Sequence, residues 1–173
     1  GTYESHSQWP TGLPGFRAIL LEWFDCCCRL SLLLLERLAE SLGAPAGTLH
    51  QHFTPEHTSF LRLNYYPECE NPASALEDMP THGHLGISPH TDAGALTVLV
   101  QDDVAALQVR HEGAWHTVSP EADALIINLG DLMEVWSNGL YRAPEHRVLA
   151  NTSVTRYSAP FFLNPNFSCD VAP

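Results

Sequence analysis

From residue 60 onward the sequence consists of short apolar stretches separated by turn residues, and this pattern restricts the fold more than any other feature. The stretches predict strands at 60–66, 86–90, 94–100, 106–110, 114–118, 124–129, 146–150 and 155–163. One brief helical stretch, 131–137, interrupts them. Short strands with frequent turn signals are typical of antiparallel sandwiches and barrels, so we expect a mainly β architecture.

The residues before the strands predict one long helix between Pro14 and Gly43. Apolar side chains recur there at every third or fourth position, in a stripe that includes Ile19, Trp23, Leu30 and Leu33. Gly43 followed by Pro45 is a stop signal. We expect the leucine-rich stripe to pack on the β sheet, an irregular lead-in over residues 1–15, and a short second helix over 45–53.

This division predicts one compact domain made of two parts. Residues 1–59 are expected to be a lead-in with helical support, and residues 60–173 a β core. Because the chain begins with Gly1 rather than Met, we also expect it to be a trimmed piece of a longer chain.

The charge balance excludes several classes of partner. Asp and Glu number 20 against 8 Lys and Arg, for a net charge of −12. Nucleic acids and anionic membranes both require a basic surface, so neither is expected as a partner. No signal peptide is visible, and the apolar run at 30–35 is too short to span a bilayer. The five cysteines are expected to be reduced thiols. Together with the lack of a visible signal peptide, they predict a cytoplasmic location. The oligomeric state stays open.

The clearest chemical signal is the run His90-Thr91-Asp92 at the end of a predicted strand. Residues i and i+2 of a strand point to the same face, so the imidazole and the carboxylate are expected to converge. A second histidine, His146, begins another predicted strand. Two histidines and one carboxylate on one face of a β-barrel form a ligand set for non-haem Fe(II) with open coordination positions.

Two further groups of polar residues alternate along predicted strands. Arg156 and Ser158 offer a guanidinium and a hydroxyl, which suit the carboxylate of a small molecule. An arginine directed into a barrel requires such an anionic partner. Arg62, Asn64 and Tyr66 also share one strand face, which either binds the same co-substrate or faces solvent.

Together these motifs resemble the 2-oxoglutarate- and Fe(II)-dependent dioxygenases, in their isopenicillin N synthase-like branch. The resemblance extends from about residue 60 to 162. It rests on Asn64-Tyr65-Tyr66-Pro67, Gly86-Ile87-Ser88-Pro89-His90-Thr91-Asp92, Gly94-Ala95-Leu96-Thr97, Leu107-Gln108-Val109, Asn128-Leu129-Gly130-Asp131, Ser137-Asn138-Gly139, His146-Arg147-Val148 and Arg156-Tyr157-Ser158.

The resemblance implies a double-stranded β-helix, also called a distorted jelly roll. It implies Fe(II) as the metal, with 2-oxoglutarate as co-substrate and O2 as oxidant. The implied catalytic metal ligands are His90, Asp92 and His146. The residues implied to bind the distal carboxylate of 2-oxoglutarate are Arg156, Ser158, Tyr66 and Asn64.

By the same resemblance the protein is an oxidoreductase. It is expected to couple oxidative decarboxylation of 2-oxoglutarate to succinate with hydroxylation or desaturation of a small organic substrate. The carboxylate of Asp92 argues against halogenation, because halogenating relatives lack this acid. Phe162 lies on the expected face of the Arg156 strand, where it either contacts substrate or packs in the core.

Two alternatives remain open from the sequence. The first is an Fe(II) oxidase of the same fold that does not use 2-oxoglutarate, with ascorbate as a candidate reductant. The second is an inactive metal-binding jelly-roll fragment. A structural metal favours a closed set of four ligands, so the open set of three favours catalysis.

Overall fold

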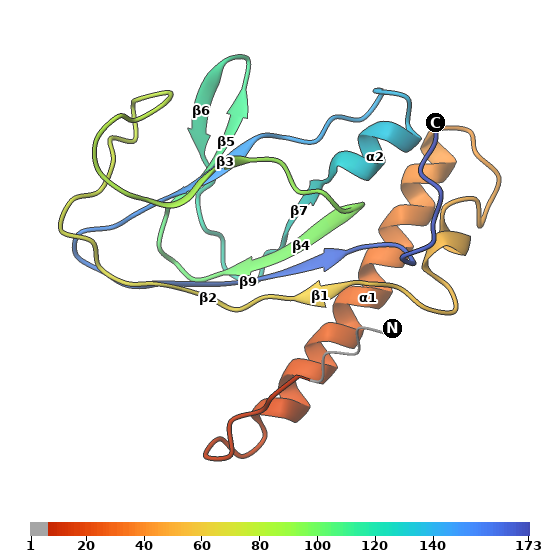
Figure 1. The fold of residues 1–173 in the computed structure, drawn as a ribbon, viewed down its shortest axis with the longest axis horizontal. Coiled ribbons are helices and arrows are strands. Elements are labelled where there is room, and N and C mark those ends of the chain that lie inside the picture. The colour runs from red at the N-terminus through yellow and green to blue at the C-terminus, as the bar shows by residue number, and fades with distance from the viewer. Residues whose placement is uncertain (1–6) are drawn as a thin grey trace.

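A computed structural model describes residues 7–173; residues 1–6, part of the expected lead-in, lie outside the described residues. One long helix, α1, precedes the strands, as the sequence predicts (Figure 1). The elements are α1 (Phe16–Ser41), the 3-10 helix η1 (His50–Phe53), β1 (Phe60–Leu61), β2 (Asn64–Tyr66), β3 (Leu85–His90), β4 (Leu96–Gln101), β5 (Leu107–His111), β6 (Ala114–Thr117), β7 (Ile126–Leu129), α2 (Asp131–Trp136), β8 (His146–Leu149) and β9 (Arg156–Leu163).

The strands form two antiparallel sheets that face each other across a pocket. The five-stranded sheet has the order β1-β9-β4-β7, and β2 also pairs with β9. The four-stranded sheet has the order β3-β8-β5-β6. Strands distant in the sequence are therefore neighbours in space, as a double-stranded β-helix requires, and the expected jelly-roll fold is confirmed.

Helix α1 packs on the five-stranded sheet, but the predicted stripe of buried residues is wrong in part. The buried positions are Cys27, Ser31, Leu35 and Ala39, one turn apart along a single row. Ile19 and Leu33 of the predicted stripe are 66% and 53% exposed. Leucines surround this helix on several sides, so their spacing did not identify the row that contacts the sheet.

Among the described residues, no helix combines the length and apolarity needed to cross a membrane.

Two predicted elements, a helix and a strand, differ clearly from those in the structure, and the division of the strand has a physical reason. The helix expected over 45–53 is reduced to η1. The strand expected over 60–66 is divided into β1 and β2, although both halves pair with β9 in the same register, Leu61 opposite Phe161 and Asn64 opposite Ser158. At the division the N–H of Arg62 donates to the carbonyl of Pro160, 3.0 Å away, and Pro160 has no N–H to return the bond.

Candidate metal centre and carboxylate-binding site

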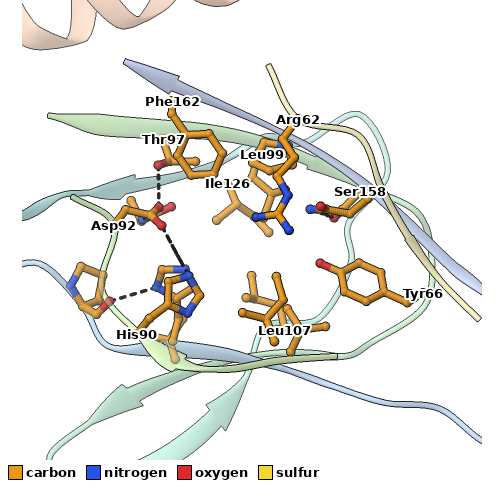
Figure 2. A pocket seen from close by; sticks show the side chains of 18 of the residues that line it. Arg62, Tyr66, His90, Asp92, Thr97, Leu99, Leu107, Ile126, Ser158 and Phe162 are labelled. Atoms are coloured by element: carbon orange, nitrogen blue, oxygen red, sulfur yellow. Dashed lines mark hydrogen bonds and ion pairs between the residues drawn. The ribbon is translucent and has the colours of Figure 1, made fainter. Parts of the chain in front are cut away.

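A pocket between the two sheets brings together residues from seven strands (Figure 2). Its walls are apolar and include Leu99 and Ile126 from one sheet and Leu107 and Val148 from the other. Polar side chains gather at its two ends. His90, Asp92 and His146 lie at one end, and Arg156, Ser158, Asn64 and Tyr66 line the rest of the pocket.

The two histidines are positioned by strand pairing. His90 ends β3 and His146 begins β8, and the two residues are directly paired in the antiparallel register. Their rings lie 4.2 Å apart between centroids. Their Nε2 atoms lie 3.6 and 3.5 Å from Oδ1 of Asp92. The three side chains that the sequence singled out therefore meet at one point.

The backbone fixes which nitrogen of each imidazole is available. Nδ1 of His90 lies 2.8 Å from the carbonyl oxygen of Ser88, and Nδ1 of His146 lies 3.1 Å from that of Pro144. Because a carbonyl oxygen only accepts, each Nδ1 carries the proton and donates it. Each Nε2 then presents its lone pair toward Asp92, as a metal ligand must.

Asp92 is positioned by a loop and not by a strand, which the sequence did not predict. Strand β3 ends at His90, so Asp92 belongs to the following loop, and the argument from strand alternation was wrong for this residue. The loop is held because the N–H of Asp131 donates to the carbonyl of Asp92 at 2.8 Å. Gly130 permits this approach, since a Cβ there would lie 2.7 Å from the same carbonyl oxygen and would also clash with the carbonyl of Gly94.

Two further side chains hold the carboxylate of Asp92. The hydroxyl of Thr97 donates to Oδ2 at 2.6 Å, and the amide of Asn128 donates to the same oxygen at 2.7 Å. Both residues lie in motifs that resemble those of the dioxygenases, but neither was predicted to have a role. For Asn128 the available signal was the run Asn128-Leu129-Gly130-Asp131, in which three of the four residues support Asp92.

The donor set fits a divalent metal ion. Two donor atoms with bonds of about 2.1 Å to a common ion lie at most about 4.2 Å apart, and both Nε2–Oδ1 distances are shorter than this limit. Two neutral imidazoles and one carboxylate on one side of the ion match the open triad typical of non-haem Fe(II).

The other end of the pocket holds a buried guanidinium with an unmet donor. Arg156 is 2% exposed, its Nη2 donates to Gln101 at 2.7 Å, and its Nε donates to the carbonyl of Val104 at 3.3 Å. Its Nη1 is buried and has no hydrogen-bond partner within residues 7–173. Burial lowers the pKa of Arg156 from its usual value, although a guanidinium stays protonated at neutral pH. An anionic ligand would complete this site.

The neighbours of Arg156 offer further groups toward the same space. The ring of Tyr66 lies under the guanidinium, 5.1 Å from ring centroid to Cζ. Ser158 is buried, and its hydroxyl accepts from the amide of Asn64 at 3.3 Å. These three side chains and Arg156 come from β2 and β9, which pair directly.

Arg62 and Phe162, whose roles the sequence left open, both line the pocket. Arg62 shares the pocket-facing side with Asn64 and Tyr66, and its side chain reaches into the cavity between the triad and Ser158 (Figure 2). Phe162 lines the pocket too and stacks on Phe60, with ring centroids 4.8 Å apart. Continuous strand alternation along β9 therefore puts Phe162 on the face of Arg156.

Fold and site together define a class: a double-stranded β-helix protein with an open His-Asp-His metal triad and a buried arginine in the same pocket. A family model described as the 2OG-Fe(II) oxygenase superfamily matches residues 57–165. The chain belongs to this family.

Individual relatives agree with the family assignment. Jasmonate-induced oxygenase 2 of Arabidopsis thaliana is 36% identical over 96% of this chain and 43% of its own length. Gibberellin 20 oxidase 1-B of Triticum aestivum is 43% identical over 84% of this chain and 37% of its own length. A crystal structure of JOX2 in complex with 2OG, Fe, and JA superposes with a TM-score of 0.84 at 35% identity, covering 95% of this chain and 47% of that one. The chain thus spans less than half the length of these relatives.

Proposed function

We propose that this chain is the core of an Fe(II)- and 2-oxoglutarate-dependent oxygenase that hydroxylates or desaturates a small organic substrate. The observation that carries the proposal is the buried, unpartnered Nη1 of Arg156 in the pocket that also contains the His-Asp-His triad. An unsatisfied buried donor costs about 1–3 kcal/mol, so a ligand carboxylate at this position is strongly favoured.

In this proposal each polar group has a stated role. His90, Asp92 and His146 hold Fe(II) through two Nε2 atoms and Oδ1. Arg156 binds the distal carboxylate of 2-oxoglutarate through its free N–H, and the groups that assist it are the side chains of Ser158, Tyr66 and Asn64. When bound, Fe(II) and 2-oxoglutarate supply an oxidant from O2 as the keto acid is decarboxylated to succinate.

The charges of this arrangement balance. Fe(II) carries two positive charges, the carboxylate of Asp92 one negative, 2-oxoglutarate two negative, and the guanidinium of Arg156 one positive. The sum over these four groups is zero, which suits a pocket whose walls are formed by Leu99, Leu107 and other apolar side chains, and the positive charge of Arg62 is left for a substrate. These walls also restrict water at the reacting centre.

For the substrate we propose a small organic acid that contacts Phe162 and Arg62. Phe162 offers an apolar face beside the triad, and the guanidinium of Arg62 forms no ion pair with the described residues. The relative JOX2 has a crystal structure with JA. Succinate formation from 2-oxoglutarate is expected to rise with organic acids and much less with their neutral amides. Equal stimulation by both would contradict the role of Arg62.

The organisation and location of the chain follow the same proposal. We propose residues 60–173 as the catalytic core and the part before them as a lead-in with helical support. The five cysteines are all free thiols, as expected in a reducing compartment, and we propose the cytoplasm.

The direct test is anaerobic addition of Fe(II) and then 2-oxoglutarate. Chelation of the metal by the keto acid should produce a weak visible charge-transfer band, and admission of air should convert 2-oxoglutarate to succinate. Normal Fe(II) binding without the band would indicate an oxidase that does not use 2-oxoglutarate. An inactive metal-binding fragment would bind Fe(II) but consume no O2 after air is admitted, whereas failure to bind Fe(II) would contradict the proposed metal centre.

A further inference from the structure

The two hydrogen bonds to Asp92 end on a single oxygen. Thr97 and Asn128 both donate to Oδ2, at 2.6 and 2.7 Å, while Oδ1 faces the two imidazoles. The donors are directly paired across β4 and β7, so one row of the sheet presents both of them. Asp92 and Thr97 are 7% and 3% exposed, so water does not compete freely for this oxygen.

We propose that Thr97 and Asn128 are positioning residues that restrict Asp92 to binding the metal through one oxygen. A carboxylate oxygen has two lone-pair sites, and two donors occupy both of those on Oδ2. Only Oδ1 retains lone pairs for a metal ion. The hydrogen bonds to Oδ2 thus keep that oxygen from the metal and leave Oδ1 as the single ligand atom of Asp92.

This restriction determines how many coordination positions stay open. An octahedral ion held by two imidazoles and one carboxylate oxygen would keep three positions free. A keto acid that binds through two oxygens, together with O2, would need all three. If Asp92 bound through both oxygens, one of these positions would be lost, and 2-oxoglutarate would compete with the second oxygen.

The consequence of this inference, the binding of 2-oxoglutarate, rests on the proposed function. The hydrogen bonds to Oδ2 of Asp92 do not depend on it. A merely structural role for Thr97 and Asn128 makes a different prediction. It would weaken folding, and with it metal and keto-acid binding in parallel, without changing the way in which the metal is coordinated.

The test compares Thr97→Val and Asn128→Leu, singly and combined, with Thr97→Ser as the matched control that keeps the hydroxyl. Co(II) serves as the first probe, because its visible absorption reports the ligands around the metal without 2-oxoglutarate. In the double variant the second oxygen of Asp92 should replace a solvent ligand, so we expect its spectrum to change, whereas that of Thr97→Ser should match the wild type. Unchanged spectra in the folded double variant would overturn the proposal.

The second measurement is the affinity for 2-oxoglutarate of the Fe(II)-loaded protein without O2. Removal of both donors should weaken it by about 10- to 100-fold, whereas metal affinity should stay within about threefold because a second oxygen compensates. If the affinities for metal and for 2-oxoglutarate fall in parallel, and Thr97→Ser loses both as well, the proposal is overturned in favour of a structural role. If the double variant does not fold, the nearly isosteric Thr97→Val alone must show the same pattern.

The two arms separate this inference from the proposed function. If the wild type forms no complex with 2-oxoglutarate, the proposed function fails, and the Co(II) spectra still decide whether Asp92 is restricted to one oxygen. If the wild type binds 2-oxoglutarate and the folded double variant binds it equally well, the inference alone fails.

Discussion

Two arginines of this protein are equally buried and differ in what surrounds them. Arg147 on β8 is 0% exposed, and Arg156 on β9 is 2% exposed. Burial lowers the pKa of both guanidinium groups, because each is removed from water. The difference lies in their hydrogen-bond partners and not in their depth.

Arg147 is satisfied by the protein itself. It follows His146 on β8, so its side chain points to the opposite face of the sheet, away from the pocket. Its guanidinium also lies over the ring of Trp115, 4.3 Å from the centroid. Its N–H groups donate at 2.8 to 3.2 Å to the side chain of Gln108 and to the carbonyls of Ala75, Glu77 and Asp78.

Among the described residues, the guanidinium of Arg156 donates hydrogen bonds to only two groups, and its buried Nη1 has no hydrogen-bond partner. Burial alone therefore does not distinguish a structural arginine from one that can bind a ligand. Unmet hydrogen-bonding capacity in a pocket does, because folding has left there a cost that a bound ligand would remove. Substitution of each arginine should therefore affect a different measurement.

The largest effect is expected from Arg147→Met. This change leaves three backbone carbonyls and Gln108 without their donor, so the free energy of unfolding should fall by about 3–5 kcal/mol. Urea denaturation of the metal-free protein measures it. A loss below about 1 kcal/mol would show that the segment 75–78 does not depend on this arginine, and would contradict the structural role assigned to Arg147.

The corresponding change at the other site is Arg156→Met. Loss of a buried charged partner should weaken binding of 2-oxoglutarate by about 2–5 kcal/mol, or roughly 30- to 4,000-fold, with metal binding kept. The unfolding free energy of the metal-free protein should change by less than about 1 kcal/mol, because a group with an unmet donor is removed. Equal loss of metal and 2-oxoglutarate binding would instead assign Arg156 to the fold.

Stabilisation of the folded protein by 2-oxoglutarate should also differ between the two arginine variants. With Mn(II) in place of Fe(II), 2-oxoglutarate at a hundred times its dissociation constant should stabilise the wild type by about 2.7 kcal/mol. At the same concentration Arg147→Met should keep this increment and Arg156→Met should lose it. Thermal unfolding with and without 2-oxoglutarate measures both, and an increment retained by Arg156→Met would contradict the proposed carboxylate site.

The smallest effect is expected from Ser158→Ala. It removes one hydroxyl beside Arg156 and should weaken 2-oxoglutarate binding by about 1.5 kcal/mol, or about tenfold, because the lost hydrogen bond is to a charged group. Calorimetric titration of the metal-loaded protein measures it. An unchanged affinity would limit the carboxylate site to Arg156 and its other neighbours.

Much of this site could be predicted from the sequence because its signals are local. The spacing of His90 and Asp92, and that of Arg156 and Ser158, depends only on neighbouring residues. The start of β8 at His146 was predicted in the same way. The resemblance of the motifs to known oxygenases then supplied the family and the fold, which the comparisons support.

The features that the sequence did not predict depend on contacts between distant segments. Asp92 lies outside β3 and is held by the N–H of Asp131. The buried row of α1 is set by the sheet it contacts and not by the leucines of the helix. The break between β1 and β2 reflects Pro160 on the partner strand.

The sequence by itself determined that this chain folds into antiparallel strands with two histidines, an aspartate and an arginine available for a metal and a carboxylate. Only the tertiary structure decided which oxygen of Asp92 faces the metal site and which arginine retains a free donor. The physical reason is that alternation along a strand fixes the direction of a side chain, whereas its partners come from segments that pairing and packing bring beside it. Thr97, Asn128 and Arg147 obtained their roles in that second way.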